Sequence, residues 1–234
     1  MTPSRVHENL SQIQERIAEA AKRGGRRPEE ITLIAVSKTH PANAIRQAYE
    51  AGVRHFGENR VQEWEGKRGG IQDLPATWHL IGHLQGNKAA RAAKLFHSVD
   101  SVDDFALAQR LDRARTELPQ TEKLRALIEV RVGQEASKSG AEIADVPELG
   151  EKIAALPRLE LAGFLCIPPF FANAEEVRPY FRRVRELRDA VQLRLGRALP
   201  ALSMGMSHDF EIAIEEGATE VRLGTALFGT RGHA

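Results

Sequence analysis

The sequence predicts a single (β/α)₈ TIM barrel, a ring of eight parallel strands enclosed by helices, and three observations support this prediction. Strand-like and helix-like segments alternate along nearly the whole chain, which is the pattern of a parallel sheet. There are eight such strand–helix units, the number that closes a barrel. The length of 234 residues suits one domain of this size, so we expect one domain over residues 1–234.

The composition excludes several function classes. Lysine and arginine total 33 against 32 aspartates and glutamates, so we expect neither nucleic acid nor an anionic membrane as a partner. Cys166 is the only cysteine, which excludes an intramolecular disulfide and a four-thiolate zinc site. The eight histidines show no metal-ligand spacing, so we expect no metal. Without a signal-like or membrane-spanning apolar run, the expected location is the cytoplasm.

The opening segment, residues 1–25, predicts an extra helix packed on the barrel. Its apolar residues recur at helical spacing, at Val6, Leu10, Ile13 and Ile17. Gly24 and Gly25, followed by Pro28, end the pattern. The apolar stripe fits either the bottom of the barrel or the surface of a partner.

The eight expected strands follow in order. They occupy residues 31–36, 53–56, 77–81, 96–99, 124–132, 159–165, 199–203 and 220–223. The first is apolar enough to be buried on both faces. Helical stretches separate the strands, and the clearest span 103–118, 175–195 and 209–216. The alternative is an open doubly wound sheet, but no G-x-G-x-x-G motif follows the first strand.

The C-terminal ends of the strands are where a (β/α)₈ barrel places its chemistry. The first strand ends in Ser37-Lys38-Thr39. A lysine there lies over the barrel mouth, where its amine can act as a nucleophile toward a carbonyl group. The alternative role for Lys38 is a solvated lysine that opens a loop.

The segments after strands seven and eight contain small and hydroxyl residues, which suit a phosphate site. Ser207 lies in the first segment, and Gly224 and Thr225 lie in the second. Ser207 alone also fits the N-cap of the helix that follows. Arg222, at the end of the eighth strand, is either part of this site or a surface residue in a salt bridge.

Six motifs in this order resemble the pyridoxal 5′-phosphate (PLP) homeostasis protein family, single-domain relatives of the alanine racemase N-terminal barrel. They are Ala35-Val36-Ser37-Lys38-Thr39, Phe56-Gly57-Glu58-Asn59, Trp78-His79-Leu80-Ile81-Gly82, Ala136-Ser137-Lys138-Ser139-Gly140, Ile167-Pro168-Pro169 and the segment from Leu202 to Gly229. Each motif alone is a weak signal, whereas the ordered set covers almost the whole chain.

The resemblance implies a PLP-binding protein that holds its cofactor as an internal aldimine, a Schiff base, on Lys38. The implied contacts to the cofactor come from Asn59, His79, Met204, Ser207, Arg222, Gly224 and Thr225. Arg222 would face the pyridine nitrogen and keep it unprotonated, because two adjacent cations repel each other. An unprotonated ring is a weaker electron sink than a pyridinium, so the site suits carbanion chemistry poorly.

Two departures from the family pattern affect the rim of the predicted site. His83 and Gly86 stand where relatives usually have proline and serine, and residues 129–133 lack an asparagine common after the fifth strand. Lys138 is either a second cofactor contact near the rim or a solvated loop lysine.

The resemblance favours a carrier in PLP homeostasis, without racemase turnover, that supplies PLP-dependent enzymes. The sequence ends soon after the eighth strand, so we expect no C-terminal β-domain with a second catalytic base, and a monomer. Tyr49 and Tyr180 lie in predicted outer helices. The alternatives are a PLP-dependent racemase or decarboxylase, with His83 or His208 as second base, and an enzyme acting on a free phosphorylated metabolite.

Overall fold

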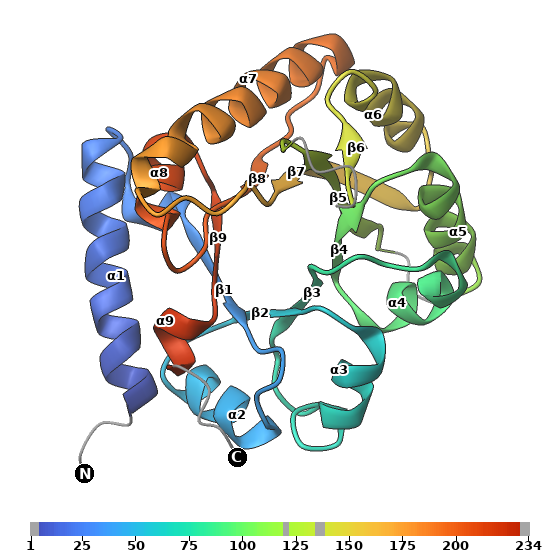
Figure 1. Cartoon of the computed structure of the whole chain (residues 1–234). Helices are drawn as coiled ribbons and strands as arrows, with labels where there is room; N and C mark the ends of the chain where they lie inside the picture. Colours follow the sequence, from blue (N-terminus) through green and yellow to red (C-terminus); the bar gives the residue numbers. More distant parts are fainter. Residues whose placement is uncertain (1–4, 119–121, 134–138, 230–234) are drawn as a thin grey trace.

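Strand pairing closes the sheet into a ring in the computed structural model, which describes residues 5–118, 122–133 and 139–229 (Figure 1). The ring strands are β1 (Thr32–Val36), β2 (His55–Glu58), β3 (Thr77–Leu80), β4 (Ser98–Val102), β5 (Leu124–Arg131), β7 (Leu159–Cys166), β8 (Ala201–Ser203) and β9 (Glu220–Leu223). All are parallel, and β4 pairs with β5 to complete the ring. The predicted barrel is confirmed, and the open sheet is wrong.

Helices form the outer layer around this ring (Figure 1). They are α1 (Arg5–Arg23), α2 (Ala42–Glu50), α3 (Val61–Arg68), α4 (Ala89–Leu95), α5 (Phe105–Thr116), α6 (Val146–Ala154), α7 (Arg178–Leu195), α8 (Phe210–Glu215) and α9 (Thr225–Phe228). Short 3₁₀ turns occur at Pro28–Glu30, Gly86–Lys88 and Ala174–Val177. None of the helices among the described residues is long and apolar enough to cross a membrane.

Several strand boundaries differ from the predicted ones, and the starts of three strands differ by two residues. β2 and β4 begin two residues later than expected, at His55 and Ser98, and β8 begins at Ala201. A two-residue strand, β6 (Ala141–Glu142), pairs with the end of β5 and was not predicted. Strand ends depend on where the neighbouring strand offers backbone partners, and local periodicity does not carry that information.

Alternate strand residues face the helices and the barrel interior. On β3, Trp78 stacks on Phe56 and meets Trp64 of α3, whereas His79 points inside. Where β7 crosses β8 only glycine fits: Gly163 has a φ of 152°, and a Cβ there would lie 1.9 Å from the Ala201 carbonyl oxygen. A small apolar cluster fills the interior beside it, formed by Leu127, Ala162, Leu165 and Ala201.

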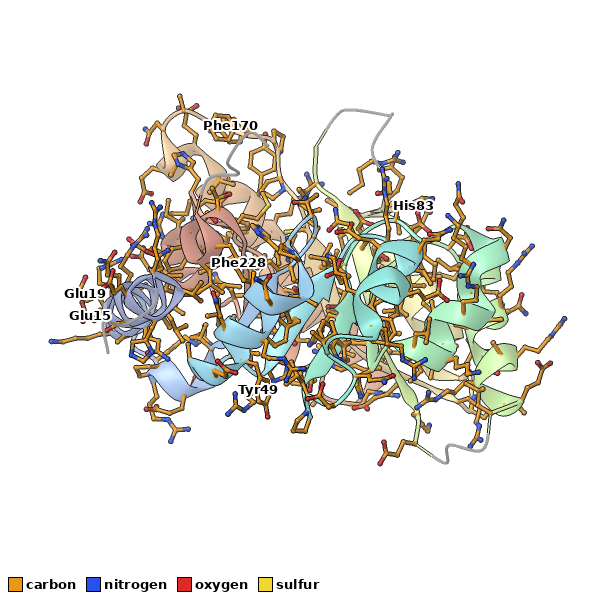
Figure 2. All side chains as sticks on the ribbon, turned by 90° about the horizontal axis from the view of Figure 1, so that it is seen from below. Glu15, Glu19, Tyr49, His83, Phe170 and Phe228 are labelled. Carbon is orange, nitrogen blue, oxygen red and sulfur yellow. The ribbon has the colours of Figure 1, made fainter. Side chains whose placement is uncertain are left out.

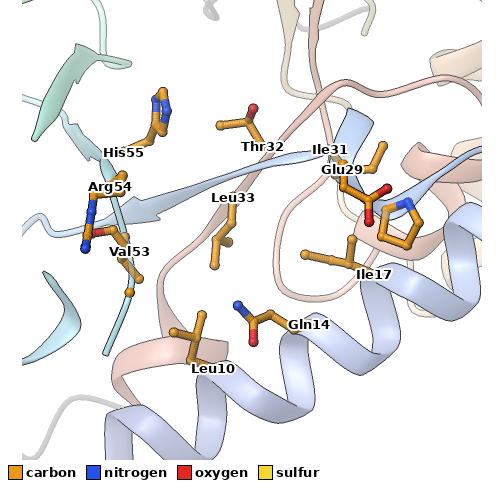
Figure 3. Close-up of a pocket in the computed structure, with 12 residues that line it drawn as sticks. Leu10, Gln14, Ile17, Glu29, Ile31, Thr32, Leu33, Val53, Arg54 and His55 are labelled. Atoms are coloured by element: carbon orange, nitrogen blue, oxygen red, sulfur yellow. The ribbon is translucent and has the colours of Figure 1, made fainter. Parts of the chain in front are cut away.

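Helix α1 packs against the side of the barrel, next to α8 and α9, and not across its bottom (Figures 1 and 2). The Asn9 amide donates to the Leu227 carbonyl at 2.8 Å, and Arg16 pairs with Glu211 at 2.6 Å. The apolar stripe of α1 therefore faces α8 and α9, and of the two surfaces it was open to, the bottom of the barrel is not the one it covers. Between α1 and the N-terminal ends of β1 and β2 lies a cleft of about 400 Å³, lined by Leu10, Gln14 and His55 among others (Figure 3).

Candidate functional site

The mouth at the C-terminal ends of the strands gathers residues that are far apart in the sequence. Lys38 follows β1, Asn59 follows β2, and Thr225 follows β9. Because every strand is parallel, these ends open on one face. Figure 2 shows His83 and Phe170 toward this face and Tyr49 toward the opposite one.

Lys38 lies on a turn between β1 and α2. Ser37 before it is buried, and its backbone N–H donates to the Gly57 carbonyl at 3.0 Å. The Lys38 side chain is exposed and makes no ion pair with any described residue. Thr39 after it has a φ of 66°. The structure therefore presents an amine at the mouth without a fixed counter-charge.

The loops after β8 and β9 lie against each other. The Ala226 N–H in α9 donates to the Ser207 hydroxyl at 3.3 Å, and the Arg222 N–H donates to the Gly205 carbonyl at 3.0 Å. The N-cap alternative for Ser207 is wrong, because Asp209 precedes α8 and Ser207 bonds to a different helix. Ser207 thus lies beside the first turn of α9, which begins at Thr225.

Arg222 is buried inside the barrel. Its guanidinium donates to the Ser203 hydroxyl at 3.0 Å and to the Cys166 carbonyl at 2.9 Å. Burial lowers the pKa of this arginine below its usual value. The surface salt-bridge alternative is wrong, because no carboxylate of the described chain pairs with it. A buried cation with neutral partners leaves positive potential for an anionic or electron-rich ligand.

Glu129 on β5 is an ionisable residue of the mouth that the sequence did not single out. Its side chain is buried, and one oxygen accepts from the Ser139 hydroxyl at 3.0 Å. The other oxygen has no hydrogen-bond partner among the described residues. Burial raises the pKa of this carboxyl group. A pocket beside Glu129 is lined by residues 129–133, Ser139 and Ile167.

His79 belongs to a polar cluster deeper in the barrel. Its ring nitrogens contact Asp100 at 3.0 Å and His55 at 3.1 Å. Arg125 donates to the Ser98 hydroxyl at 3.1 Å and pairs with Glu220. Apart from His79 and Asp100, these residues lie near the N-terminal ends of their strands. We call these six residues, His55, His79, Ser98, Asp100, Arg125 and Glu220, the lower cluster.

Charges within the lower cluster largely compensate one another. Although burial opposes it, His79 and Arg125 hold the pKa of Asp100 below its usual value. Burial, helped by the neighbouring His79, lowers the pKa of His55 to about 4. Ligand atoms of His79, Asp100 and Glu220 lie within 4.8 Å of one another, as in metal sites. Arg125 pairs with both carboxylates, Asp100 at 3.7 Å and Glu220, although one Glu220 oxygen has no hydrogen-bond partner among the described residues. Because a cation is already shared between the two carboxylates, we read the cluster as a structural network.

The remaining predicted contacts have different surroundings. Asn59 is half-buried, and its backbone packs on Gly82, where a Cβ would lie 2.5 Å from the Asn59 carbonyl oxygen. Met204 is fully buried and packs in the core between strands and helices. Its contact with a cofactor, like that of Asn59 and His79, stays a prediction. Lys138 lies outside the described residues.

Two histidines and two tyrosines were considered as catalytic bases. Tyr49 packs under Arg54, and Tyr180 packs on Phe171, both in the outer layer. His208 contacts the Phe171 carbonyl at 3.1 Å on the exposed rim. The His83 ring lies 3.3 Å from the Asp103 carboxylate on the other side of the mouth. There His83 lines a pocket together with Gly86 and Arg110.

Cys166 has the expected role of a small buried hydrophobe. It is fully buried, and burial raises the pKa of its thiol to about 12, so the thiol is protonated at neutral pH.

Comparison with known proteins agrees with this geometry. The family model described as alanine racemase, N-terminal domain, matches residues 8–232. The chain belongs to this family. It is 46% identical over 224 residues to a pyridoxal phosphate homeostasis protein of Aquifex aeolicus, covering 96% of this chain and 97% of that one. It is 48% identical over 229 residues to one of Pseudomonas aeruginosa, covering 97% and 96% of the two chains. The resemblance found in the motifs is confirmed.

Solved structures show the same architecture. PipY of Synechococcus elongatus, solved with PLP bound, superposes with a TM-score of 0.84 at 39% identity, covering 96% of this chain and 100% of that one. An alanine racemase of Clostridium difficile superposes with a TM-score of 0.71 at 17% identity, covering 97% of this chain but 57% of that one. The second comparison shows the shared barrel alone.

Proposed function

We propose that this chain binds PLP at the barrel mouth through Lys38 and acts in PLP homeostasis. Two side chains at the same mouth carry the proposal: an exposed lysine without an ion pair and a buried arginine without a carboxylate partner, both judged over the residues that the structure describes. PLP offers an aldehyde that can react with the Lys38 amine and an electron-rich ring nitrogen that can meet the Arg222 guanidinium. The PLP-bound relative and the pyridoxal phosphate homeostasis relatives support this assignment.

The residues present fit this cofactor. Ser207 and Thr225 come together beside the first turn of α9, where hydroxyl and N–H groups suit a phosphate. Lys67, another lysine close to the mouth, is held by Glu58 at 3.0 Å and Glu63 at 2.7 Å. With the Ser37 carbonyl, these two carboxylates occupy the Lys67 ammonium, whereas Lys38 makes no ion pair among the described residues and is free to meet an aldehyde.

A carrier role follows from the surroundings of Arg222. When bound, PLP supplies an aldehyde that captures amines and a ring that withdraws electrons. The Arg222 cation beside the ring nitrogen opposes protonation of that nitrogen and so weakens the electron sink. Of the described tyrosines, Tyr49 lies toward the opposite face of the barrel, and Tyr180 packs on Phe171 in the outer layer. These features favour storage and delivery of the cofactor over racemase turnover.

The recipients in this proposal are PLP-dependent enzymes that lack their cofactor. The chain would act in the cytoplasm as a monomer, as one domain over residues 1–234. PLP bound reversibly by a lysine is kept from reacting with other cellular amines and can still be passed on.

The direct test compares Lys38→Ala with wild type and with Lys94→Ala, an exposed lysine on α4. Each protein is incubated with PLP, its absorbance spectrum recorded, and its peptides mapped by mass after borohydride reduction. Wild type and Lys94→Ala should carry one phosphopyridoxyl group on Lys38, and Lys38→Ala should lose essentially all covalent labelling. A wild-type protein that stays colourless and unmodified would refute the proposal.

The same samples separate a carrier from an enzyme. In deuterated water with small amino acids, a racemase exchanges the α-hydrogen, and a carrier does not. We expect no exchange above that of free PLP. If the wild-type protein exchanges the α-hydrogen and Lys38→Ala does not, the carrier hypothesis is refuted in favour of a PLP-dependent racemase or decarboxylase.

A further inference from the structure

The turn that presents Lys38 is held in a conformation that its own residues do not favour. Among the described residues, Thr39 is the only non-glycine with a positive φ. Threonine is β-branched, and a φ of 66° brings its branched side chain close to the backbone. Such a conformation persists only where neighbouring groups hold it, and it is found preferentially at functional sites.

The holding contacts come from β2 and α3 and surround Lys38 on both sides. After Lys38, the Thr39 N–H donates to a Glu63 carboxylate oxygen. Before Lys38, the Ser37 carbonyl accepts from the Lys67 ammonium at 2.8 Å. Lys67 also donates to the same Glu63 oxygen at 2.7 Å, so the two contacts form one connected unit.

The unit is anchored in the barrel wall by Glu58. Its side chain has no exposed surface, and one oxygen accepts from the Ser37 hydroxyl at 2.7 Å and from Lys67 at 3.0 Å. Lys67 is 12% exposed and Glu63 25%. Although burial works against it, hydrogen bonds from Lys67 and Thr39 hold the pKa of Glu63 below its usual value, so it is charged at neutral pH.

A comparison within the chain shows that this arrangement exceeds an ordinary helix ion pair. Glu148 and Lys152 of α6 have the same i,i+4 spacing and the same place at the start of a helix, and they lie 2.5 Å apart. Their side chains are 68% and 49% exposed, and no hydrogen bond links either side chain to a backbone group of the described chain. The α3 pair, by contrast, directs both charges to the backbone beside Lys38.

We infer that Glu63 and Lys67, anchored by Glu58, are positioning residues that fix the Lys38 turn so that its amine projects into the mouth. Resting on the proposed function, the inference predicts that this unit sets how tightly PLP is held. A loosened turn must be ordered again whenever PLP binds, which weakens the affinity and speeds release.

The test uses Glu63→Met, Glu63→Gln and the matched control Glu148→Met. Glu63 is partly exposed and does not belong to the hydrophobic core, so its replacement leaves the core intact. Methionine removes the acceptor for Thr39, whereas glutamine keeps a side-chain oxygen in place. We expect Glu63→Met to bind PLP about tenfold more weakly and to release it faster, an effect equal to one lost charge-assisted hydrogen bond. Glu63→Gln should recover most of this loss, and Glu148→Met should match wild type.

A second readout needs no cofactor. Amide hydrogen exchange of Thr39 in the PLP-free protein should accelerate in Glu63→Met and stay slow in Glu148→Met, with the melting temperatures close to wild type. Equal PLP affinity and equal Thr39 exchange in Glu63→Met and wild type would overturn the inference while leaving the proposed function intact. Failure of the wild-type protein to bind PLP would instead remove the proposed function.

Discussion

The two ends of the barrel interior treat buried polar groups in opposite ways. In the lower cluster, each member contacts another, and Arg125 lies between the carboxylates of Asp100 and Glu220. At the mouth, Arg222 has only neutral hydrogen-bond partners and Lys38 has no ion pair among the described residues. Both ends are built from charged residues, but only the lower one compensates its own charges.

This difference in charge compensation distinguishes a cluster that stabilises the fold from a site that binds a ligand, and it does so from the geometry of this chain alone. A compensated cluster gains nothing from a ligand, whereas uncompensated charges at an open face leave interactions for one. The lower cluster should therefore govern stability and the mouth should govern binding. Substitutions at the two ends should separate these two roles.

Replacing Arg125 by methionine should destabilise the fold by about 3 kcal/mol, because it removes the cation paired with the buried Glu220 and leaves Asp100 with His79 alone. Urea unfolding of the PLP-free protein measures the loss. Arg46→Met is the control, since Arg46 pairs with Asp73 on the surface, and it should unfold close to wild type. If the two variants unfold at the same urea concentration, the lower cluster does not stabilise the barrel.

Replacing Arg222 by methionine should have the opposite effect, with little change in stability and a clear loss of PLP affinity. We expect the free energy of unfolding to stay within about 1 kcal/mol of wild type, because a buried cation without a carboxylate partner is removed. PLP affinity should fall about tenfold, as one charged contact to the cofactor is lost. Urea unfolding and PLP titration on the same sample give both numbers. A large loss of stability with unchanged affinity would reverse the division between the two ends.

Glu129→Gln should alter how stability depends on pH. Burial raises the pKa of Glu129, so above its unfolded value the native state holds more protons than the unfolded state. The wild-type protein therefore loses stability as pH rises through this window, and the glutamine variant does not. The two proteins should be similar near pH 4, and the variant should be the more stable at pH 7, as measured by urea unfolding.

Glu151→Gln provides a control of opposite sign for this pH dependence. Glu151 pairs with Arg194 on the surface, and the hydrogen bond from Arg194 lowers the pKa of Glu151. Its contribution to stability is present at neutral pH and is lost as pH falls through the lowered pKa. An identical pH profile for Glu129→Gln and wild type would show that the Glu129 carboxyl is not perturbed by burial.

Much of the fold was readable from local pattern. The alternation of strand-like and helix-like segments located all eight ring strands. The apolar run at residues 31–36 is the clearest of them, because a strand buried on both faces favours continuous apolar sequence. The starts of β2 and β4 were wrong by two residues, and the two-residue β6 was missed. These features depend on pairing with strands that are distant along the chain.

Part of the site was readable in the same way. Residues at strand ends, such as Lys38 and Thr225, were predictable because the barrel fixes where those ends open. Glu58 lay in a quoted motif without an assigned role. The i,i+4 spacing of Glu63 and Lys67 was a signal that could have revealed their pairing. Glu129 gave no signal, because nothing local to the strand shows that its carboxyl group is buried and half-satisfied.

By itself the sequence determined the barrel, the eight strand–helix units and the lysine at the end of the first strand, since these follow from periodicity and from the geometry of parallel strands. Only the tertiary structure decided that Arg222 lacks a counter-ion, that Arg125 has two, and that Glu63 reaches the backbone beside Lys38. The interaction free energy of a charged side chain depends on the groups that surround it. Those groups come from segments that are far apart in the sequence, and their separation along the chain does not predict their distance in the fold.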